Sequence, residues 1–579
     1  MKLTNVFAKY IKYLGIKNVF GLQGGAVVHF FDSLEKANIN ITYTHHEESA
    51  ALAATSYAKA TNNISCAIFT TGPGSTNAIT GLAAAWQDSV PVIFISGQAR
   101  SNHVSYGKKV RQVGTQEINI CDIVRPICKY TKFVKKKEDF VKELKKAKKI
   151  ALSGRPGPVW LDIPLELQWA DIKFNDNFKI KNFNDEYKKN FSIYKKVNSF
   201  LKKSHKPLII IGYGAKNRSN IEILKKIIKK YKIPFVTTWN SKDFIETENK
   251  YNLGTIGMSG QRGANKAIFQ SDLLICLGTH LSIPHTTTLY DKYAPNAKKI
   301  IVNIDKNQLK NLNIKFDLKI NDNVNNFFEW IEQNKENYSF EWKNLPILKS
   351  MNWYKIKKSI KPNSNLLIHQ LTKTIKKRSC IVVDGGGTAL YSGFQSSVIK
   401  KNTRLICSSA ISSMGTGLAE TIGVSKSKLF KEIYCIIGDG SFLMNIQDLQ
   451  TIIQDKINVC ILLINNNGYL AIRHTQKEFL KGKYFGTHPK GNLTFPNYKK
   501  IAKAFSIKYL ELKKNSQINY VIDKIKKNNG PLICEVFTSE NQSSLFKQGY
   551  KEVEKGKFEP QPLSEMYPFF QKGLSNTNN

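Results

Sequence analysis

The sequence predicts an α/β protein with three doubly wound parallel sheets, and three observations support this fold class. Apolar runs of strand length alternate with helical segments along all 579 residues. Several runs end in glycine and lack polar alternation, which is typical of strands buried between two layers of helices. Two polar segments, Ile172–Lys195 and residues 334–365, interrupt the pattern. We therefore expect three domains, over residues 1–170, 190–335 and 355–579.

The expected elements follow in chain order. The first residues predict an amphipathic helix whose inner face carries Val6, Phe7, Tyr10, Ile11 and Leu14. Buried strands are expected at Cys66–Thr71, Val90–Gly97, Val159–Ile163, Leu208–Gly212, Leu273–Gly278, Ile300–Ile304, Cys380–Asp384, Ile433–Gly438 and Val459–Asn465. A helix over Met444–Gln454 is expected between the last two strands. None of the apolar runs is long enough to span a bilayer.

The amino-acid composition indicates which kind of partner and which cellular compartment to expect. The chain carries 87 Lys+Arg against 44 Asp+Glu, a formal net charge of +43. Because the lysines are spread along the chain, we expect a solvated basic surface that favours anionic substrates, with no nucleic-acid partner. The nine cysteines form no CxxC pair and sit mostly in apolar runs, which predicts free thiols in a reducing compartment. With no secretory signal and no membrane segment, we expect the cytoplasm.

Two polar motifs follow neighbouring expected strands in the last third of the chain. Gly438-Asp439-Gly440-Ser441 ends one strand, and Asn465-Asn466-Asn467-Gly468 ends the next. Parallel strands present their carboxyl ends at one edge of the sheet, where open α/β sheets bind ligands. The Asp439 carboxylate and the Asn466 amide oxygen suit Mg²⁺, and the free amides of a helix opened by Gly440 and Ser441 suit a diphosphate. Each motif alone would be typical of a turn or a hairpin; together they predict a metal-bridged diphosphate site.

The motif resembles that of thiamine diphosphate enzymes, in which GDG is followed by about thirty residues ending in NN. Residues 438–449 are most similar to the acetolactate synthase group. Three segments near the N-terminus also resemble family motifs, in the family's order: Phe20–Gly25 is similar to FGxPGG with Gln23 in place of proline, His46–Ala51 to HExxA, and Thr71–Asn77 to SGPGxxN. The resemblance therefore implies an N-terminal pyrimidine-binding domain, a central domain and a C-terminal diphosphate-binding domain.

The resemblance also implies a set of site residues. Asp439, Asn466 and the Gly468 carbonyl would ligate Mg²⁺. Residues that would contact thiamine diphosphate are Gly24, Gly25, Pro73, Asn77, Gly386, Gly387, Thr388, Met414, Gly440, Ser441, Gly468, Tyr469 and Leu470. Glu47 would hydrogen-bond to the cofactor's pyrimidine ring and activate it as an acid–base group, and Gln116 would line the active site. Met414 would support the bent cofactor.

These roles imply a reaction and an assembly. The expected reaction is decarboxylation of a 2-oxo acid such as pyruvate, followed by transfer of the two-carbon unit to an acceptor. In the family the Glu47 end and the Asp439 end of one site come from different subunits. A homodimer or homotetramer with active sites at the subunit interface is therefore expected.

Three positions depart from the acetolactate synthase pattern. Thr115 and Thr475 stand where the family has aromatic residues on the acceptor side, and Ala419 replaces a proline. A smaller wall makes room for a larger or more polar acceptor, and the basic surface favours an anionic one. The tail Pro562–Phe570 together with Asn467–Arg473 resembles a subgroup associated with bacterial surface-sugar pathways. This favours a nucleotide-linked keto sugar as acceptor.

The sequence leaves several alternative functions open. A true acetolactate synthase and a non-ligating decarboxylase are both alternatives to the sugar-linked carboligase. A non-catalytic relative is disfavoured because Glu47 and Asp439 are both present. FAD stays an open ligand of the central domain, where Gly257–Gly263 and Gly278–Ser282 match the family's places but His280 replaces an arginine.

Overall fold

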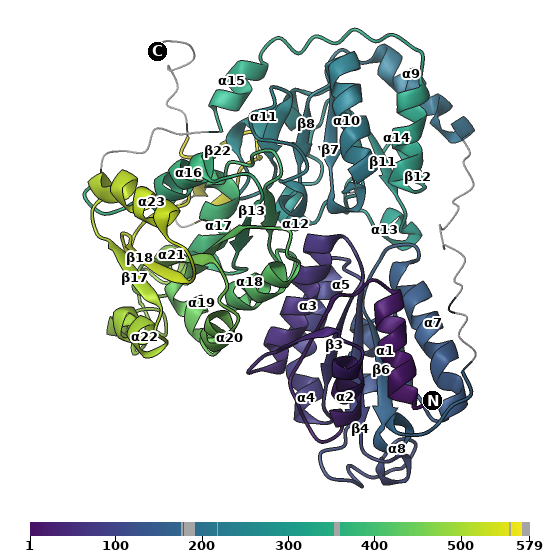
Figure 1. Ribbon diagram of the computed structural model, residues 1–579. Coiled ribbons are helices and arrows are strands. Elements are labelled where there is room, and N and C mark those ends of the chain that lie inside the picture. Colours follow the sequence, from purple (N-terminus) through teal and green to yellow (C-terminus); the bar gives the residue numbers. More distant parts are fainter. Residues whose placement is uncertain (175–177, 179–190, 217, 353–358, 555–556, 570–579) are drawn as a thin grey trace. The chain divides into compact units, whose positions relative to one another are not determined.

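The computed structural model describes residues 1–174, 178, 191–216, 218–352, 359–554 and 557–569. The chain forms two compact units. The first comprises Met1–Asp185, Arg378–Leu390 and Ile406–Glu540, and the second comprises Glu186–Lys377, Tyr391–Leu405 and Asn541–Asn579. Three six-stranded sheets with interspersed helices confirm the predicted α/β class (Figure 1). The domain bounds 1–170, 190–335 and 355–579 stay predictions.

The first sheet has the strand order β2-β1-β3-β4-β6-β5, and its described pairings are all parallel. Its strands are β1 (Asn18–Gly21), β2 (Asn40–Tyr43), β3 (Ser65–Phe69), β4 (Val92–Gln98), β5 (Tyr130–Phe133) and β6 (Val159–Pro164). Its helices are α1 (Leu3–Tyr13), α2 (Val28–Lys36), α3 (Glu47–Thr61), α4 (Pro73–Asn77), α5 (Ile79–Gln87), α6 (Ile120–Val124), α7 (Phe140–Leu152) and α8 (Leu165–Gln168). The expected N-terminal helix is α1, and all five of its predicted inner residues are buried. In this order β2 lies on one side of β1, and β3 and the later strands lie on the other. The loops after β1 and β3 therefore flank the topological switch point of the sheet.

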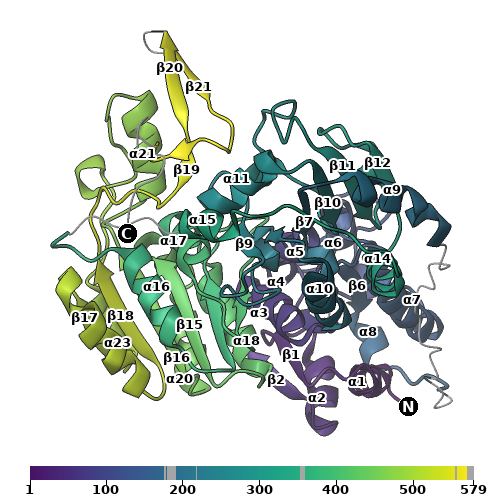
Figure 2. The same cartoon turned by 90° about the horizontal axis from the view of Figure 1, so that it is seen from above.

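The third sheet repeats this arrangement, with the order β14-β13-β15-β16-β18-β17. Its strands are β13 (Ser379–Val383), β14 (Arg404–Ile406), β15 (Glu432–Gly438), β16 (Val459–Asn465), β17 (Lys508–Leu512) and β18 (Leu532–Phe537), and the last four run side by side in Figure 2. The helices around it are α17 (Gly387–Ser396), α18 (Thr416–Lys426), α19 (Asp439–Met444), α20 (Asp448–Gln454), α21 (Leu470–Phe479), α22 (Tyr498–Ala504) and α23 (Ile518–Lys527). Its switch point lies between β13 and β15.

One expected helix of this sheet is wrong in its bounds. The segment predicted as one helix over Met444–Gln454 is divided between the end of α19 and the whole of α20. Asn445 interrupts it with φ −131° and donates its side-chain amide to the Gly415 carbonyl at 3.0 Å. This tertiary hydrogen bond holds Asn445 outside the helical conformation.

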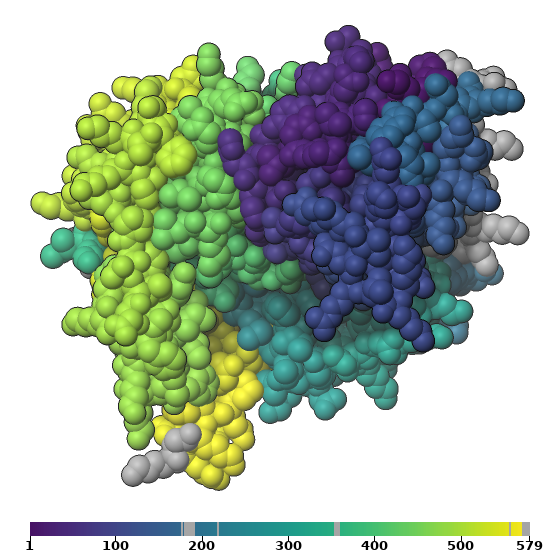
Figure 3. Space-filling view, turned by 90° about the horizontal axis from the view of Figure 1, so that it is seen from below, coloured from purple at the N-terminus to yellow at the C-terminus, as the bar shows by residue number. Residues whose placement is uncertain are grey.

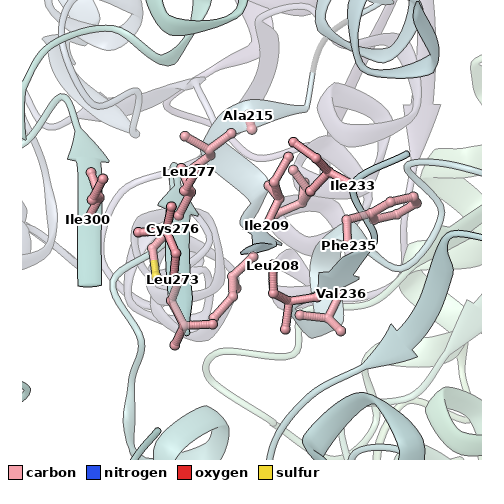
Figure 4. Packing of buried hydrophobic residues seen from close by; sticks show 14 of the residues in the cluster. Leu208, Ile209, Ala215, Ile233, Phe235, Val236, Leu273, Cys276, Leu277 and Ile300 are labelled. Carbon is pink, nitrogen blue, oxygen red and sulfur yellow. The ribbon is translucent and has the colours of Figure 1, made fainter. Parts of the chain in front are cut away.

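The second unit contains the central sheet, ordered β12-β11-β10-β7-β8-β9. Its strands are β7 (Pro207–Ile211), β8 (Phe235–Thr237), β9 (Asn252–Thr255), β10 (Leu273–Leu277), β11 (Lys298–Asn303) and β12 (Leu318–Asn321). The helices of the second unit are α9 (Lys195–Lys203), α10 (Arg218–Tyr231), α11 (Arg262–Gln270), α12 (Ile283–Thr286), α13 (Lys306–Lys310), α14 (Val324–Gln333), α15 (Leu345–Ser350) and α16 (Ser364–Thr374). Figure 4 shows the buried aliphatic side chains of β7, β8 and β10 packed side by side.

Two features of the second unit were not expected from the sequence. The polar segment 334–365 contains α15, whose Leu345 and Leu348 are buried. The tail forms two antiparallel ribbons, from the strand pairs β19 (Lys547–Gln548) with β22 (Met566–Tyr567) and β20 (Tyr550–Glu554) with β21 (Lys557–Pro560). Phe570, at the end of the tail segment compared with surface-sugar enzymes, lies outside the described residues.

Helix α3 is the structural centre of the first unit. Its residues are mostly small, and nearly all are buried because α5 packs on one side and α18 on another. Gly81 of α5 and Gly423 of α18 each lie so close to α3 that a β-carbon would collide with it. In Figure 3 the N-terminal residues, in purple, accordingly border the green residues of the third sheet. The two sheets of this unit therefore share one hydrophobic core.

The nine cysteines are buried and free, which confirms the prediction of unpaired thiols. Burial raises the pKa of most of these thiols above the ordinary value; Cys66, in β3, is an example. Within the described ranges, every helix is too short or too polar to cross a lipid bilayer.

Candidate active site

Glu47 is the first residue of α3, at the carboxyl-end side of the first sheet. Its side chain is only 7% exposed. The Asn77 side-chain amide donates to Glu47 Oε2 at 3.1 Å. The other oxygen, Oε1, faces Gly74, where an added β-carbon would lie 3.3 Å away. Helix α4, which begins at Pro73, thus holds the Glu47 carboxylate in a fixed orientation.

The loops at the switch point of the first sheet meet next to Glu47. Gly24, in the loop after β1, packs on the side chain of Thr70, which also touches Gly74. Gly72 has φ +64° and packs against the backbone carbonyl of Gln116, so a side chain there would be both strained and blocked. The structure therefore brings Gly24, Pro73, Asn77 and Gln116 to the surroundings of Glu47, while Gly25 lies exposed in the same loop.

The acceptor-side residues lie on the surface. The side chains of Gln116 and its neighbour Thr115 are exposed. Gln116 has φ +60°, and its carbonyl accepts a hydrogen bond from the Thr71 hydroxyl at 3.3 Å. Thr475 is also exposed, on α21.

Asp439 follows β15 and is the buried anchor of the second group. Its carboxylate accepts hydrogen bonds from the backbone amides of Gly440 at 2.9 Å, Asn466 at 3.1 Å and Gly468 at 3.0 Å. Burial raises the pKa of Asp439 to about 6, although these three amides and Arg473 oppose the shift. A bound cation would stabilise the charged form of this carboxylate.

Arg473 is a residue of this group that motif reasoning did not identify. Its guanidinium is buried and donates to the backbone carbonyls of Asn466 at 2.8 Å and Asn467 at 3.0 Å, and to the Asn466 side-chain oxygen at 3.3 Å. It also donates to the carbonyls of Thr487 and Glu540, at 3.1 Å each. One side chain therefore fixes the loop that carries Asn466. No local signal marks it, because two of its acceptors lie 14 and 67 residues away.

A third group surrounds the loop after β13. Asp384 is fully buried and accepts from the amides of Gly386 and Gly417, both at 3.0 Å. Because Gly386 has no side chain, Met414 and the Ser441 hydroxyl approach its backbone closely. Gly387 has φ +53° and opens α17, with Thr388 next to it. Gly386 thus meets Met414 and Ser441 at the switch point of the third sheet.

The residues at the third sheet fit a divalent cation with a diphosphate. The donor set combines a carboxylate with an amide oxygen, which are hard ligands of the kind Mg²⁺ takes. Gly440 lies under the Tyr469 ring, where a β-carbon would collide with the ring, so a side chain is excluded at this position. Leu470 is buried at the start of α21. Helices α17 and α19 both begin at this edge, and helix N-termini favour anions.

The central sheet carries the segments considered for FAD. After β7 and β10 its two switch-point loops meet through their backbones, and the Gly214 amide donates to the Gly278 carbonyl at 3.0 Å. Gly257 has φ +115° and packs against Pro284 and His285. FAD binding stays a prediction.

Comparison with known proteins agrees with this arrangement. Three thiamine pyrophosphate enzyme models match the chain: the N-terminal TPP binding domain over residues 1–123, the central domain over 194–331 and the C-terminal TPP binding domain over 385–536. The acetolactate synthase large subunit of Buchnera aphidicola subsp. Schizaphis graminum is 31% identical, over 87% of this chain and 88% of the relative. That of Cyanidium caldarium is 31% identical over 91% and 92%, and the isozyme 2 large subunit of Escherichia coli K12 is 28% identical over 91% and 93%. The chain therefore belongs to the thiamine pyrophosphate enzyme family, as an acetolactate synthase-like enzyme.

Proposed function

We propose that this enzyme decarboxylates pyruvate and ligates the resulting two-carbon unit to an acceptor, with thiamine diphosphate and Mg²⁺ as cofactors. The observation that carries the proposal is the pairing of two intact sites in one chain. One is the buried Glu47 carboxylate held by Asn77, and the other is the Asp439 carboxylate held by three backbone amides. Relatives over most of the chain are acetolactate synthases, which favours ligation over simple decarboxylation.

The proposed cofactor site uses the residues grouped above. Asp439, Asn466 and the Gly468 carbonyl would ligate Mg²⁺, whose positive charge would help to hold the diphosphate. The other residues proposed to contact the cofactor are Gly24, Gly25, Pro73, Asn77, Gly386, Gly387, Thr388, Met414, Gly440, Ser441, Tyr469 and Leu470. Their support is that each lies in a loop or helix start near Glu47, Asp439 or Asp384, and the close approach of Met414 and Ser441 to Gly386 is an example.

In the proposed mechanism the protein supplies acid–base chemistry and orientation. When bound, thiamine diphosphate supplies a carbon nucleophile and takes up the electron pair released on decarboxylation. Glu47 would exchange a proton with the pyrimidine ring, as a general acid–base group. Asn77 would keep Glu47 Oε2 in place, and burial would keep water from this carboxylate. Gln116 would contact the substrate.

The assembly proposed for this reaction is a homodimer, or a tetramer of two such dimers. Glu47 and Asp439 lie at the switch points of different sheets, and the family's cofactor contacts both. In the proposed dimer, Glu47 of one subunit faces Asp439 of its partner across an isologous interface.

The acceptor proposed first is a second 2-oxo acid, because the relatives are acetolactate synthases and lend no support to a non-standard acceptor. A second candidate is an anionic keto sugar linked to a nucleotide. It is favoured by the exposed, small side chains of Thr115 and Thr475, where acetolactate synthases have aromatic residues.

Product analysis with pyruvate labelled at C2 tests the proposal. The enzyme with thiamine diphosphate and Mg²⁺ is expected to release CO₂ and to place the label in acetolactate, as followed by NMR. If acetaldehyde were the sole organic product, the reaction would be decarboxylation without ligation. Label in a branched sugar, with acetolactate absent when pyruvate is the sole substrate, would establish the second candidate. Unchanged pyruvate under all these conditions would contradict both.

A further inference from the structure

We propose that Asp384 is a positioning residue that holds three segments of the cofactor-binding edge in register. These segments, here called the clamped segments, are the loop Gly385–Thr388, the segment Ser413–Gly417 and the start of α19 at Ser441. The proposal rests on the proposed function, in which Gly386, Met414 and Ser441 contact the cofactor.

The hydrogen bonds of Asp384 reach all three clamped segments. The Gly386 amide donates to Asp384 Oδ2 and the Gly417 amide to Oδ1, both at 3.0 Å. The Ser441 hydroxyl and the Gly415 amide also stabilise its charged form. Asp384 is thus a shared acceptor for donors that lie at least two and as many as 57 residues away in sequence.

Burying the Asp384 carboxylate costs free energy, and this cost makes its hydrogen bonds depend on one another. Asp384 is fully buried, and burial raises its pKa to about 6 despite the four donors. A buried carboxylate is tolerated when its hydrogen bonds are satisfied. Movement of any clamped segment away from Asp384 would remove a hydrogen bond from the buried carboxylate, which costs free energy. The carboxylate therefore opposes such movement.

Two further contacts close the arrangement around Asp384. The Gly385 amide donates to the Thr416 hydroxyl at 3.2 Å, which joins the first two clamped segments a second time. The Asn445 side chain donates to the Gly415 carbonyl at 3.0 Å, which joins the second segment to the end of α19. Met414 and Ser441 both lie against the Gly386 backbone. These contacts join the clamped segments through the protein's own groups, and such preorganisation of a binding surface increases affinity.

Amide hydrogen exchange on the enzyme without added cofactor tests the clamp itself. In Asp384→Asn, the side-chain nitrogen would face a backbone donor, so at least one hydrogen bond is lost. We expect Gly386 and Gly417 to exchange on the order of ten-fold faster than in the wild type, in line with the loss of a supporting contact. The matched control is Asp448→Asn, a fully buried carboxylate on α20 that faces the Ser49 hydroxyl. Unchanged protection of both glycines in Asp384→Asn would overturn the clamp.

Calorimetric titration with thiamine diphosphate at saturating Mg²⁺ tests what the clamp does. The Kd of Asp384→Asn should rise by about ten-fold or more, while kcat at saturating cofactor stays within about three-fold of wild type, as a positioning role requires. Asp448→Asn should keep the wild-type Kd. A lower kcat with an unchanged Kd would overturn the proposal.

Failure of the proposed function and failure of the clamp would give different results. If wild-type enzyme binds no thiamine diphosphate, the proposed function fails, whereas the exchange experiment still reports on the clamp alone. If Asp384→Asn does not fold, Thr416→Val replaces it, because it removes the acceptor of the Gly385 amide without changing side-chain size greatly. Faster exchange at Gly385 and a weaker Kd would support the proposal, and wild-type values of both would overturn it.

Discussion

Arg473 shows at the residue scale how one buried side chain can determine the shape of a metal-binding loop. Its guanidinium satisfies backbone carbonyls of Asn466 and Asn467, and also those of Thr487 and Glu540. Buried carbonyls without a donor are costly, so removal of this side chain would release the loop. The orientation of Asn466, a proposed ligand of Mg²⁺, therefore depends on Arg473.

The substitution Arg473→Met is expected to weaken Mg²⁺ binding by roughly 10–100-fold, the usual effect of losing a group that orients a metal ligand. The measurement is the Mg²⁺ concentration needed for half-maximal thiamine diphosphate binding. Arg262→Met is the control, because Arg262 is equally buried but donates to carbonyls of Met566 and Pro568 in the second unit. Equal Mg²⁺ dependence in the two variants would show that Arg473 has no such role.

The site residues differ in how far the sequence could predict them. Asp439 and Asn466 could be predicted because each directly follows an apolar strand, so local pattern and sheet geometry place them together. Glu47 depended on a resemblance, since a glutamate at a helix start is usually solvated. Asp384 and Arg473 could not be assigned roles, because their partners come together only through tertiary folding.

At the element scale, the close packing of α3 against α18 dominates the first unit. Gly423 lies where any side chain would meet the Ala53 carbonyl and the Ser56 hydroxyl of α3. The Ser56 hydroxyl also donates to the Glu420 carbonyl at 2.9 Å. The two helices therefore have little freedom to separate without losing packing and a hydrogen bond.

Gly423→Ala is expected to lower the free energy of unfolding by about 1–3 kcal/mol, because overpacking outweighs the better helix propensity of alanine. Urea unfolding of the first unit's core, followed by circular dichroism, measures this change. Ser425→Ala, two residues along the same helix, should stay near the wild type. A gain of stability in Gly423→Ala would mean that the helices are not in close contact.

The elements that the sequence predicts well are those buried on both faces. β7 and β16 are continuous apolar runs, so their pattern alone predicts central strands. β2 and β17 lie at sheet edges with half-exposed residues and carry no comparable run. The helix expected over Met444–Gln454 is divided because Asn445 bonds to Gly415, a contact that local sequence does not reveal.

At the scale of the whole molecule, a buried charged cluster joins the first and third sheets within the first unit. Lys59 of α3 pairs with Asp88 at 2.6 Å and donates to the Cys407 carbonyl at 2.9 Å. Ser408 donates to the Glu420 carboxylate at 2.5 Å. Burial raises the pKa of Glu420 to about 7, and Lys59 and Ser408 oppose this shift. Glu420 therefore titrates in a range where its protonation alters the stability of the unit.

The sign of the pH effect follows from this raised pKa. Glu420 binds its proton more tightly in the folded state, so its contribution is complete below pH 4.5, the ordinary value, and is lost as the pH rises through about 7. Compared with the wild type, Glu420→Gln should therefore gain stability as the pH increases from about 5 to 8. Thermal unfolding across this range measures the difference. A stability difference that is constant with pH would contradict the assigned titration.

One calorimetric comparison separates the two proposed roles, in which Asp439 holds the metal and cofactor and Glu47 performs the acid–base chemistry. Thiamine diphosphate is titrated with Mg²⁺ into the wild type, Asp439→Asn and Glu47→Gln, and turnover of pyruvate is measured on the same samples. Asp439→Asn should bind at least about ten-fold more weakly, whereas Glu47→Gln should bind nearly as the wild type and lose about 10²–10⁴-fold in kcat. Wild-type affinity in Asp439→Asn would show that this carboxylate does not hold the metal and cofactor. Undiminished turnover in Glu47→Gln would show that Glu47 is not the acid–base group.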